Sequence, residues 1–311
     1  MKKVFFILMA ISFVGCYQVG NLPPIEDPFV GNFLVCAKDN TTGPFKTFGT
    51  LESNLKKFFD SFVVAPDGSS LPPELDYSSN INYDSRVDYQ KLLNEKESTT
   101  TKELRSSILG HINAIDLNST NNEEIVAALL NAYNFIAIDI VIQNSCEGLI
   151  KSIANLGGEN SFKAFSDSIN FGYQVAGKVM SLDQIEKEKI AELTNYEDAR
   201  IHFAVICASA GCPVLLHKPF NKDELDEQLS FITRAGLRLP RMFENRGETT
   251  FLSQIFDWYL DDFISDIARE EDFDTDEEFI QAFVKKYTPE GTSFNINDIE
   301  FVNYDWTLNS P

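Results

Sequence analysis

Residues 123–141 are so apolar that this stretch has to lie in the interior of whatever fold the chain adopts. The first of two apolar sets recurs at three- and four-residue steps and predicts a helix: Ile125, Leu129, Tyr133, Ile136 and Ile140. The second set widens this stripe until the helix is apolar on nearly every side: Val126, Leu130, Ala137 and Val141. Ser119 and Thr120 precede the stretch, and two glutamates at its start suit the positive end of a helix dipole. We therefore expect a buried central helix with the other elements packed around it.

Two carboxamides, Asn131 and Asn134, lie one turn apart inside this apolar helix. A buried carboxamide is costly unless its oxygen and its nitrogen both have hydrogen-bond partners. The favoured interpretation is that these side chains tie a neighbouring loop to the helix, because most buried side-chain amides bond to backbone. Direct contact with a substrate is the alternative.

The rest of the body mixes helical and strand-like patterns without regular alternation. Helical spacing occurs in six further segments: 50–62, 101–115, 181–193, 222–232, 252–267 and 277–287. Apolar alternation predicts strands in 162–165, 171–175, 200–208 and 295–308. The sequence predicts an α+β fold, a single globular domain over 46–311 with helices packed on a mixed or antiparallel sheet.

Composition excludes several classes of function. The 311 residues are 43% hydrophobic, which is enough for a substantial core. Because 26 basic residues stand against 47 acidic ones, the net charge of −21 would repel a nucleic acid backbone, and we expect no nucleic-acid partner. With three histidines and no paired ligand spacing, we expect neither a metal site nor a cofactor.

The N-terminus has the pattern of a bacterial export signal. Residues 1–15 join two lysines to a short apolar run, and the sequence from Phe13 to Cys16 resembles a lipobox, in which the cysteine thiol is lipidated. Tyr17, rather than aspartate, follows the cysteine, which is the pattern of outer-membrane sorting. We expect an exported lipoprotein anchored in the outer membrane through acyl chains on Cys16, on its periplasmic or surface face, with 16–45 as a tether.

One segment, residues 200–213, combines a histidine with two thiols. Cys212 precedes a proline, which fits the first position of a helix, so Cys212 is expected at a helix N-terminus, where the dipole stabilises a thiolate. On a strand, His202 and Cys207 would point to opposite faces about 16 Å apart, which makes them poor partners. Three interpretations stay open: Cys212 is a nucleophile with His202 as its base, Cys207 and Cys212 form a disulfide, or both are ordinary buried thiols.

Other cysteines and histidines bear on the same question. His217 is the rival of His202, but its sequence surroundings are more typical of a loop residue with a solvated ring. Cys36 and Cys146 are a plausible disulfide pair because the remaining two body cysteines lie close together. The connectivity among these four cysteines does not follow from sequence.

Five short motifs together resemble the DUF547 family, in this order: Asn131-Ala-Tyr-Asn134, Ser181-Leu-Asp-Gln-Ile-Glu186, Arg200-Ile-His202-Phe-Ala, Cys207-Ala-Ser209 and Cys212-Pro213. Two later stretches, 256–263 and 304–309, are similar to its C-terminal elements, so the resemblance covers about 85–311. It implies a fold related to papain-like or transglutaminase-like enzymes. It also implies Cys212 as nucleophile, His202 as general base and Glu186 as the acid that orients the imidazole.

The resemblance implies acyl transfer or amide hydrolysis by a cysteine nucleophile, on a peptide or protein substrate in the cell envelope. Asn131, Asn134, Cys207 and Ser209 are the residues expected around that site. This chain has Lys187 after the glutamate where many relatives have histidine. The competing hypothesis is a non-catalytic lipoprotein that binds a protein or an envelope polymer through aromatic side chains.

Overall fold

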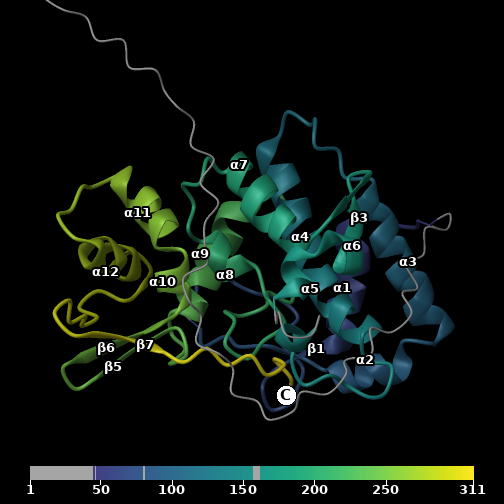
Figure 1. Cartoon of the computed structure of the whole chain (residues 1–311), viewed down its shortest axis with the longest axis horizontal. Helices are drawn as coiled ribbons and strands as arrows, with labels where there is room; N and C mark the ends of the chain where they lie inside the picture. Colours follow the sequence, from purple (N-terminus) through teal and green to yellow (C-terminus); the bar gives the residue numbers. More distant parts are fainter. Residues whose placement is uncertain (1–44, 46, 80, 157–161) are drawn as a thin grey trace, which may run out of the picture. The chain divides into compact units, whose positions relative to one another are not determined.

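The apolar stretch forms α4 (Asn122–Gln143), the longest helix of the computed structural model, which describes residues 45, 47–79, 81–156 and 162–311 (Figure 1). The expected export signal, Cys16, Cys36 and residues 16–44 of the expected tether lie outside the described residues. The side chain of Asn121 caps α4 by accepting a hydrogen bond from the Glu124 amide. The predicted central helix is confirmed.

Burial of α4 is nearly complete, because seventeen of its residues between Ile125 and Ile142 are buried. It packs against helices on several sides, among them α1 (Leu51–Phe62), α2 (Tyr89–Glu95) and α3 (Thr99–Asn113). In the described part of the chain, α4 alone is long and apolar enough to cross a membrane, and 94% of its most apolar window is buried inside the protein. Its hydrophobicity is accounted for by the core.

The N-terminal helices follow the sequence patterns closely. Thr50 and Ser53 form a capping box at the start of α1, and Ser98 caps α3. Between α1 and α2 lies a small antiparallel pair, β1 (Val63–Val64) with β2 (Arg86–Val87). The helices expected at 50–62 and 101–115 are confirmed.

The middle of the chain consists of short elements: η1 (Ile153–Asn155), α5 (Lys163–Ser166), α6 (Ser168–Phe171), β3 (Tyr173–Val175), β4 (Lys178–Met180), η2 (Gln184–Ile190) and α7 (Ala191–Leu193). The strand expected at 162–165 is wrong: the segment forms the helical turn α5, and Asp167 then caps α6 through two backbone amides. The strand β3 falls within 171–175, as expected. The expected hydroxyl cap is also present, since Ser181 Oγ accepts from the Gln184 amide that opens η2.

The C-terminal part carries α8 (Ile201–Ala204), α9 (Leu225–Gly236), β5 (Phe243–Arg246), β6 (Thr249–Ser253), α10 (Ile255–Trp258), α11 (Leu260–Ala268), α12 (Asp276–Tyr287) and β7 (Ile299–Val302). The three strands form a mixed sheet in which β6 pairs antiparallel with β5 and parallel with β7 (Figure 1). The fold is α+β, as expected. Its sheets are small, and most of the described core is formed where helices pack on one another.

The strand expected at 200–208 is wrong in its first half. Residues 201–204 form one helical turn, α8, and the chain becomes extended only at Val205. The turn is fixed at its start because Asp266 accepts from the Ala199 amide at 3.0 Å and Asp198 pairs with Arg200 at 2.8 Å. Every residue from Ile201 to Ile206 is buried, so the polar positions that distinguish a helix from a strand are missing here.

Candidate functional site

The two cysteines lie on a tight loop that follows α8. The chain reverses at Ala208, which has a φ of 61°, a left-handed conformation that is uncommon for a residue with a side chain. The loop closes where the Cys212 amide donates to the Ser209 carbonyl at 3.1 Å. Residues 213–224 form no helix, so the expected position of Cys212 at a helix N-terminus is wrong.

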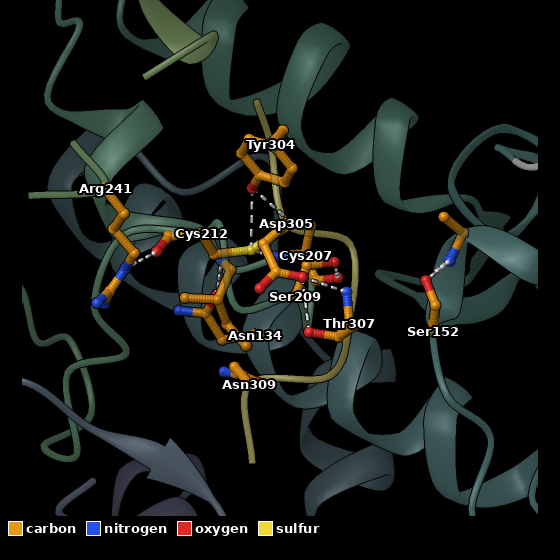
Figure 2. Close-up of a disulfide and its surroundings, with 12 residues drawn as sticks. Asn134, Ser152, Cys207, Ser209, Cys212, Arg241, Tyr304, Asp305, Thr307 and Asn309 are labelled. Carbon is orange, nitrogen blue, oxygen red and sulfur yellow. Dashed lines mark hydrogen bonds between the residues drawn. A yellow bond between two sulfur atoms is a disulfide. The ribbon is translucent and has the colours of Figure 1, made fainter. Parts of the chain in front are cut away.

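Cys207 and Cys212 form a disulfide, with 6.2 Å between their Cα atoms (Figure 2). Of the three interpretations left open by the sequence, this structure has the disulfide. Cys212 is buried, with 1% of its surface exposed, whereas Cys207 is partly exposed. The Cys207 amide also donates a hydrogen bond to Cys212 Sγ at 2.9 Å.

The C-terminal segment covers this loop. The amides of Ala210 and Gly211 donate to the carbonyls of Thr307 and Asp305 at 2.7 and 2.8 Å. Gly211 is required at its position, because a Cβ there would lie 2.8 Å from the Asp305 nitrogen and 3.0 Å from the ring of Tyr304. The close approach delivers the Tyr304 hydroxyl to the disulfide, 3.0 Å from Cys207 Sγ and 3.3 Å from Cys212 Sγ (Figure 2).

Arg241 holds the other side of the loop. Its Nε donates to the Cys212 carbonyl at 2.9 Å, and its terminal nitrogens bind both oxygens of Asp84 at 2.8 and 3.1 Å. Burial raises the pKa of Asp84, but Arg241 and Arg86 outweigh burial and hold that pKa below its usual value. The loop backbone is therefore anchored to a charged group more than a hundred residues away in sequence.

A second cluster surrounds His202 on α8. Its Nε2 lies 2.8 Å from Asp262 Oδ2 on α11, and its Nδ1 lies 3.5 Å from Glu186 Oε1 on η2. The imidazole also stacks on Tyr259, with 3.8 Å between ring centroids. Both ring nitrogens of His202 thus face carboxylates, not a sulfur.

The charges in this cluster reinforce one another. Burial lowers the pKa of His202, but the hydrogen bond between its Nε2 and Asp262 and the negative charges of Glu186 and Asp262 outweigh burial, so the pKa is raised. For Glu186, burial raises the pKa, while His202, Lys187 and Tyr133 together bring it below its ordinary value. These opposite shifts favour an imidazolium flanked by carboxylates.

Aromatic contacts connect the two clusters. Tyr259 stacks on His202, and its neighbour in sequence, Trp258, packs against Tyr304 with ring centroids 4.9 Å apart. Tyr304 in turn contacts both sulfurs. Burial raises the pKa of Tyr304, so its hydroxyl stays protonated and can donate.

The predicted site residues therefore fall into separate groups. Glu186 lies beside His202, while Cys212 lies beside Cys207, and Ser209 Oγ makes a 3.4 Å hydrogen bond to the Cys207 carbonyl. His217 is buried between Tyr83 and the Pro72 carbonyl, so the expectation of a solvated ring is wrong.

Asn131 and Asn134 have the structural role that was favoured. Asn134 donates to the Ala204 carbonyl at 2.8 Å and accepts from the Ile206 amide at 2.9 Å, which joins α4 to the end of α8. Asn131 makes the equivalent pair of bonds to Phe220. Every polar atom of these two side chains that faces the neighbouring loop is bonded to backbone.

Sequence reasoning missed Asp262, Tyr259 and Tyr304 as members of the site. All three lie in the stretches 256–263 and 304–309, which were noted only as similar to family elements. These stretches do contain acidic and phenolic side chains, which are typical of functional sites. The sequence does not show which residues these side chains contact.

Comparison with known proteins agrees with the motifs. Residues 117–235 match the model of a family described as "Protein of unknown function, DUF547". Over these residues the chain is similar to the DUF547 family. The matched region contains Asn131, Asn134, Glu186, His202 and both loop cysteines, whereas Asp262 and Tyr304 lie beyond it.

Two further comparisons found no relative. Neither a curated protein nor a solved structure matches this chain. The papain-like or transglutaminase-like fold implied by the resemblance therefore stays a prediction.

Proposed function

We propose that this protein is a cysteine-dependent hydrolase or acyl transferase that acts on a peptide or amide bond in the cell envelope. Cys212 is the nucleophile, in the form of the protein in which its bond to Cys207 is reduced. His202 protonates the leaving amine and, once its ring is neutral, acts as general base on the water that hydrolyses the thioester, while Glu186 orients its imidazole. The protein is exported and anchored through Cys16, which lies outside the described residues.

The observation that carries the proposal is the pair of donors aimed at Cys212 Sγ. The Cys207 amide lies 2.9 Å from this sulfur and the Tyr304 hydroxyl lies 3.3 Å from it. Hydrogen-bond donors at these positions stabilise a thiolate more than they stabilise a thiol or a disulfide sulfur, because a charged acceptor binds a donor more strongly. Reduction would thus release a sulfur that is already surrounded as a nucleophile needs.

The reaction follows from these groups. The Cys212 thiolate attacks the carbonyl carbon, and the C–N bond breaks as the amine leaves with a proton from His202. Water hydrolyses the resulting thioester, or a second amine takes the acyl group. For His202 to serve, one ring nitrogen must exchange its carboxylate for the substrate or the sulfur, and Asp262, with 32% of its side chain exposed, is the partner more readily given up.

The disulfide also supports export. Disulfides persist in oxidising compartments such as the bacterial periplasm and the cell surface. Cys207 is partly exposed, so an external thiol can attack its sulfur, forming a mixed disulfide with Cys207 and releasing Cys212 as the thiolate; a second thiol then reduces the mixed disulfide.

Acylation by p-nitrophenyl acetate tests the proposal without knowledge of the substrate. In Cys207→Ser, Cys212 is free without any reductant, and we expect a stoichiometric burst of nitrophenol with one acetyl group on Cys212 by mass spectrometry. The matched control is the double variant Cys207→Ser/Cys212→Ser, which should show no burst. Adding His202→Ala to Cys207→Ser should slow the burst by about 10²-fold or more. A folded Cys207→Ser protein that is not acetylated, or is acetylated as fast without His202, overturns the proposal.

A second candidate function is favoured by one observation, the covalent bond between Cys207 and Cys212. If this bond is permanent, the protein is a non-catalytic lipoprotein that binds a protein or an envelope polymer. Its His202 cluster then serves stability. Peptide mapping distinguishes the enzyme from the non-catalytic lipoprotein. The protein is isolated without reductant, exposed to glutathione at periplasmic redox poise and then mapped. A permanent disulfide stays fully oxidised under these conditions.

A further inference from the structure

A cleft separate from the His202 cluster opens between the loop after β1, the segment 81–84 and the end of α9. Its volume is about 440 Å³. That volume lies within the range of small-molecule sites, about 300–1,000 Å³. The cleft is thus large enough for a ligand of the size of a blocked amino acid.

The walls of the cleft are largely apolar. Leu71, Ile81 and Leu239 line it together with the ring of Tyr83. Ile81 has 39% of its surface exposed. These side chains would gain from contact with an apolar ligand, because exposed apolar surface would leave water.

The carboxylate in the cleft is already neutralised. Asp84 binds Arg86 at 2.7 Å and Arg241 at 2.8 Å, so it offers no free negative charge to a cationic ligand. Asp84, on the cleft wall, thus forms a closed group with two arginines that do not line the cleft. Their formal charges leave an excess of one positive charge.

Arg238, which also lines the cleft, differs from these two arginines. Among the residues that the structure describes, no carboxylate lies within ion-pair distance of its guanidinium. One turn earlier on α9, burial lowers the pKa of Arg234, and the like charge of Arg238 lowers it further. In a chain with a net charge of −21, these two neighbouring guanidiniums, which pair with no carboxylate in the described part of the chain, are a local excess of positive charge.

We propose that this cleft binds a small ligand whose apolar body ends in a carboxylate. Arg238 binds the carboxylate, and Leu71, Ile81 and Leu239 contact the apolar part. One unpaired guanidinium beside apolar walls fits a monoanion such as the C-terminus of a short peptide, whereas a phosphate would need more donors.

The cleft is connected to the cysteine loop but does not depend on its chemistry. Asp84 on the cleft wall binds Arg241, which donates to the Cys212 carbonyl. The inference does not rest on the proposed function, because binding is measured on the oxidised protein, in which Cys212 cannot react.

Binding of N-acetyl-leucine, followed by saturation-transfer difference NMR on the full oxidised chain, tests this site. We expect saturable binding in the millimolar range, as is usual for so small a probe. The uncharged analogue N-acetyl-leucinamide should bind at least about tenfold more weakly, because it lacks the charge that Arg238 binds.

Variants locate the binding. Arg238→Gln should weaken N-acetyl-leucine binding at least about tenfold and leave the weak binding of the amide unchanged. Ile81→Ser should weaken both probes. The matched control is Arg246→Gln, on β5, whose guanidinium is exposed and pairs with Glu244. The proposal is wrong if the acid and the amide bind equally, if Arg238→Gln has no effect, or if inorganic phosphate competes better than the acid.

Discussion

The hydroxyl of Tyr304 lies 3.3 Å from the sulfur of Cys212, although the two residues are 92 positions apart in the chain. It also lies 3.0 Å from Cys207 Sγ, so one phenol contacts both atoms of the disulfide. Because the pKa of Tyr304 is raised by burial, this phenol acts only as a donor near neutral pH. Whichever sulfur becomes a thiolate on reduction will find this donor in place.

Tyr304→Phe is predicted to slow alkylation of Cys212 by iodoacetamide in Cys207→Ser at neutral pH by about tenfold or more, because a hydrogen bond to a charged acceptor contributes about 1.5–3 kcal/mol. The rate should recover at alkaline pH, where the thiolate forms without help. The measurement is the pH profile of labelling, followed by mass spectrometry. Tyr196→Phe, at an exposed tyrosine, is the control. A profile that is the same in Tyr304→Phe and the control contradicts the prediction.

His202 is predicted to stabilise the fold most at mildly acidic pH. Its folded-state pKa is raised, so its contribution is fully present below its ordinary value of 6.5 and is lost as the pH rises through the folded-state pKa. The lowered pKa of Glu186 works in the opposite direction: its contribution is present above 4.5 and is lost as the pH falls through its folded-state pKa.

His202→Gln removes the charge and leaves two acids facing each other. Breaking a buried charge pair costs about 3–5 kcal/mol, so the variant should lose that much unfolding free energy near pH 6. The difference from the wild type should shrink as the pH rises through the folded-state pKa of His202, above which the ring is neutral in both states. Urea unfolding at several pH values measures this. A difference that does not depend on pH shows that packing against Tyr259, not charge, is what His202 supplies.

Much of the helical framework could be predicted because its signals are local. The stripe of α4, the hydroxyl of Thr50 and the asparagine cap at Asn121 all act within one or two helical turns of the residues they control. At 200–208 the local signal fails, because uniform burial removes the polar face that distinguishes the helical turn α8 from a strand.

The site could be predicted only in part, for a related reason. His202 and Glu186 were singled out through the family resemblance, and they do lie 3.5 Å apart. Asp262 lies 60 residues after its contact His202, and Tyr304 lies 92 residues after its contact Cys212. Only the tertiary fold shows these contacts. No spacing rule connects residues at such separations.

The disulfide is predicted to stabilise the protein modestly. Its two cysteines are only five positions apart in the chain, and the chain-entropy model gives about 2 kcal/mol for a loop of this size. Cys207→Ser/Cys212→Ser should therefore lower the unfolding free energy by about that amount without reductant. Urea unfolding at constant pH measures it. A much larger loss would mean that the loop, and with it the contact to Tyr304, needs the bond to form.

Asn134→Ala is predicted to destabilise the protein, because it removes the hydrogen bonds that join α4 to the segment between α8 and the cysteine loop. The substitution leaves the Ala204 carbonyl and the Ile206 amide without their partner, in a region where both residues are buried. Because an unsatisfied buried group costs about 1–3 kcal/mol, we expect a loss of about 2–5 kcal/mol of unfolding free energy in urea. Asn118→Ala, at an exposed asparagine, should change it by less than about 0.5 kcal/mol. If Asn134→Ala is equally mild, water replaces the amide, and the end of α8 is held by its apolar packing alone.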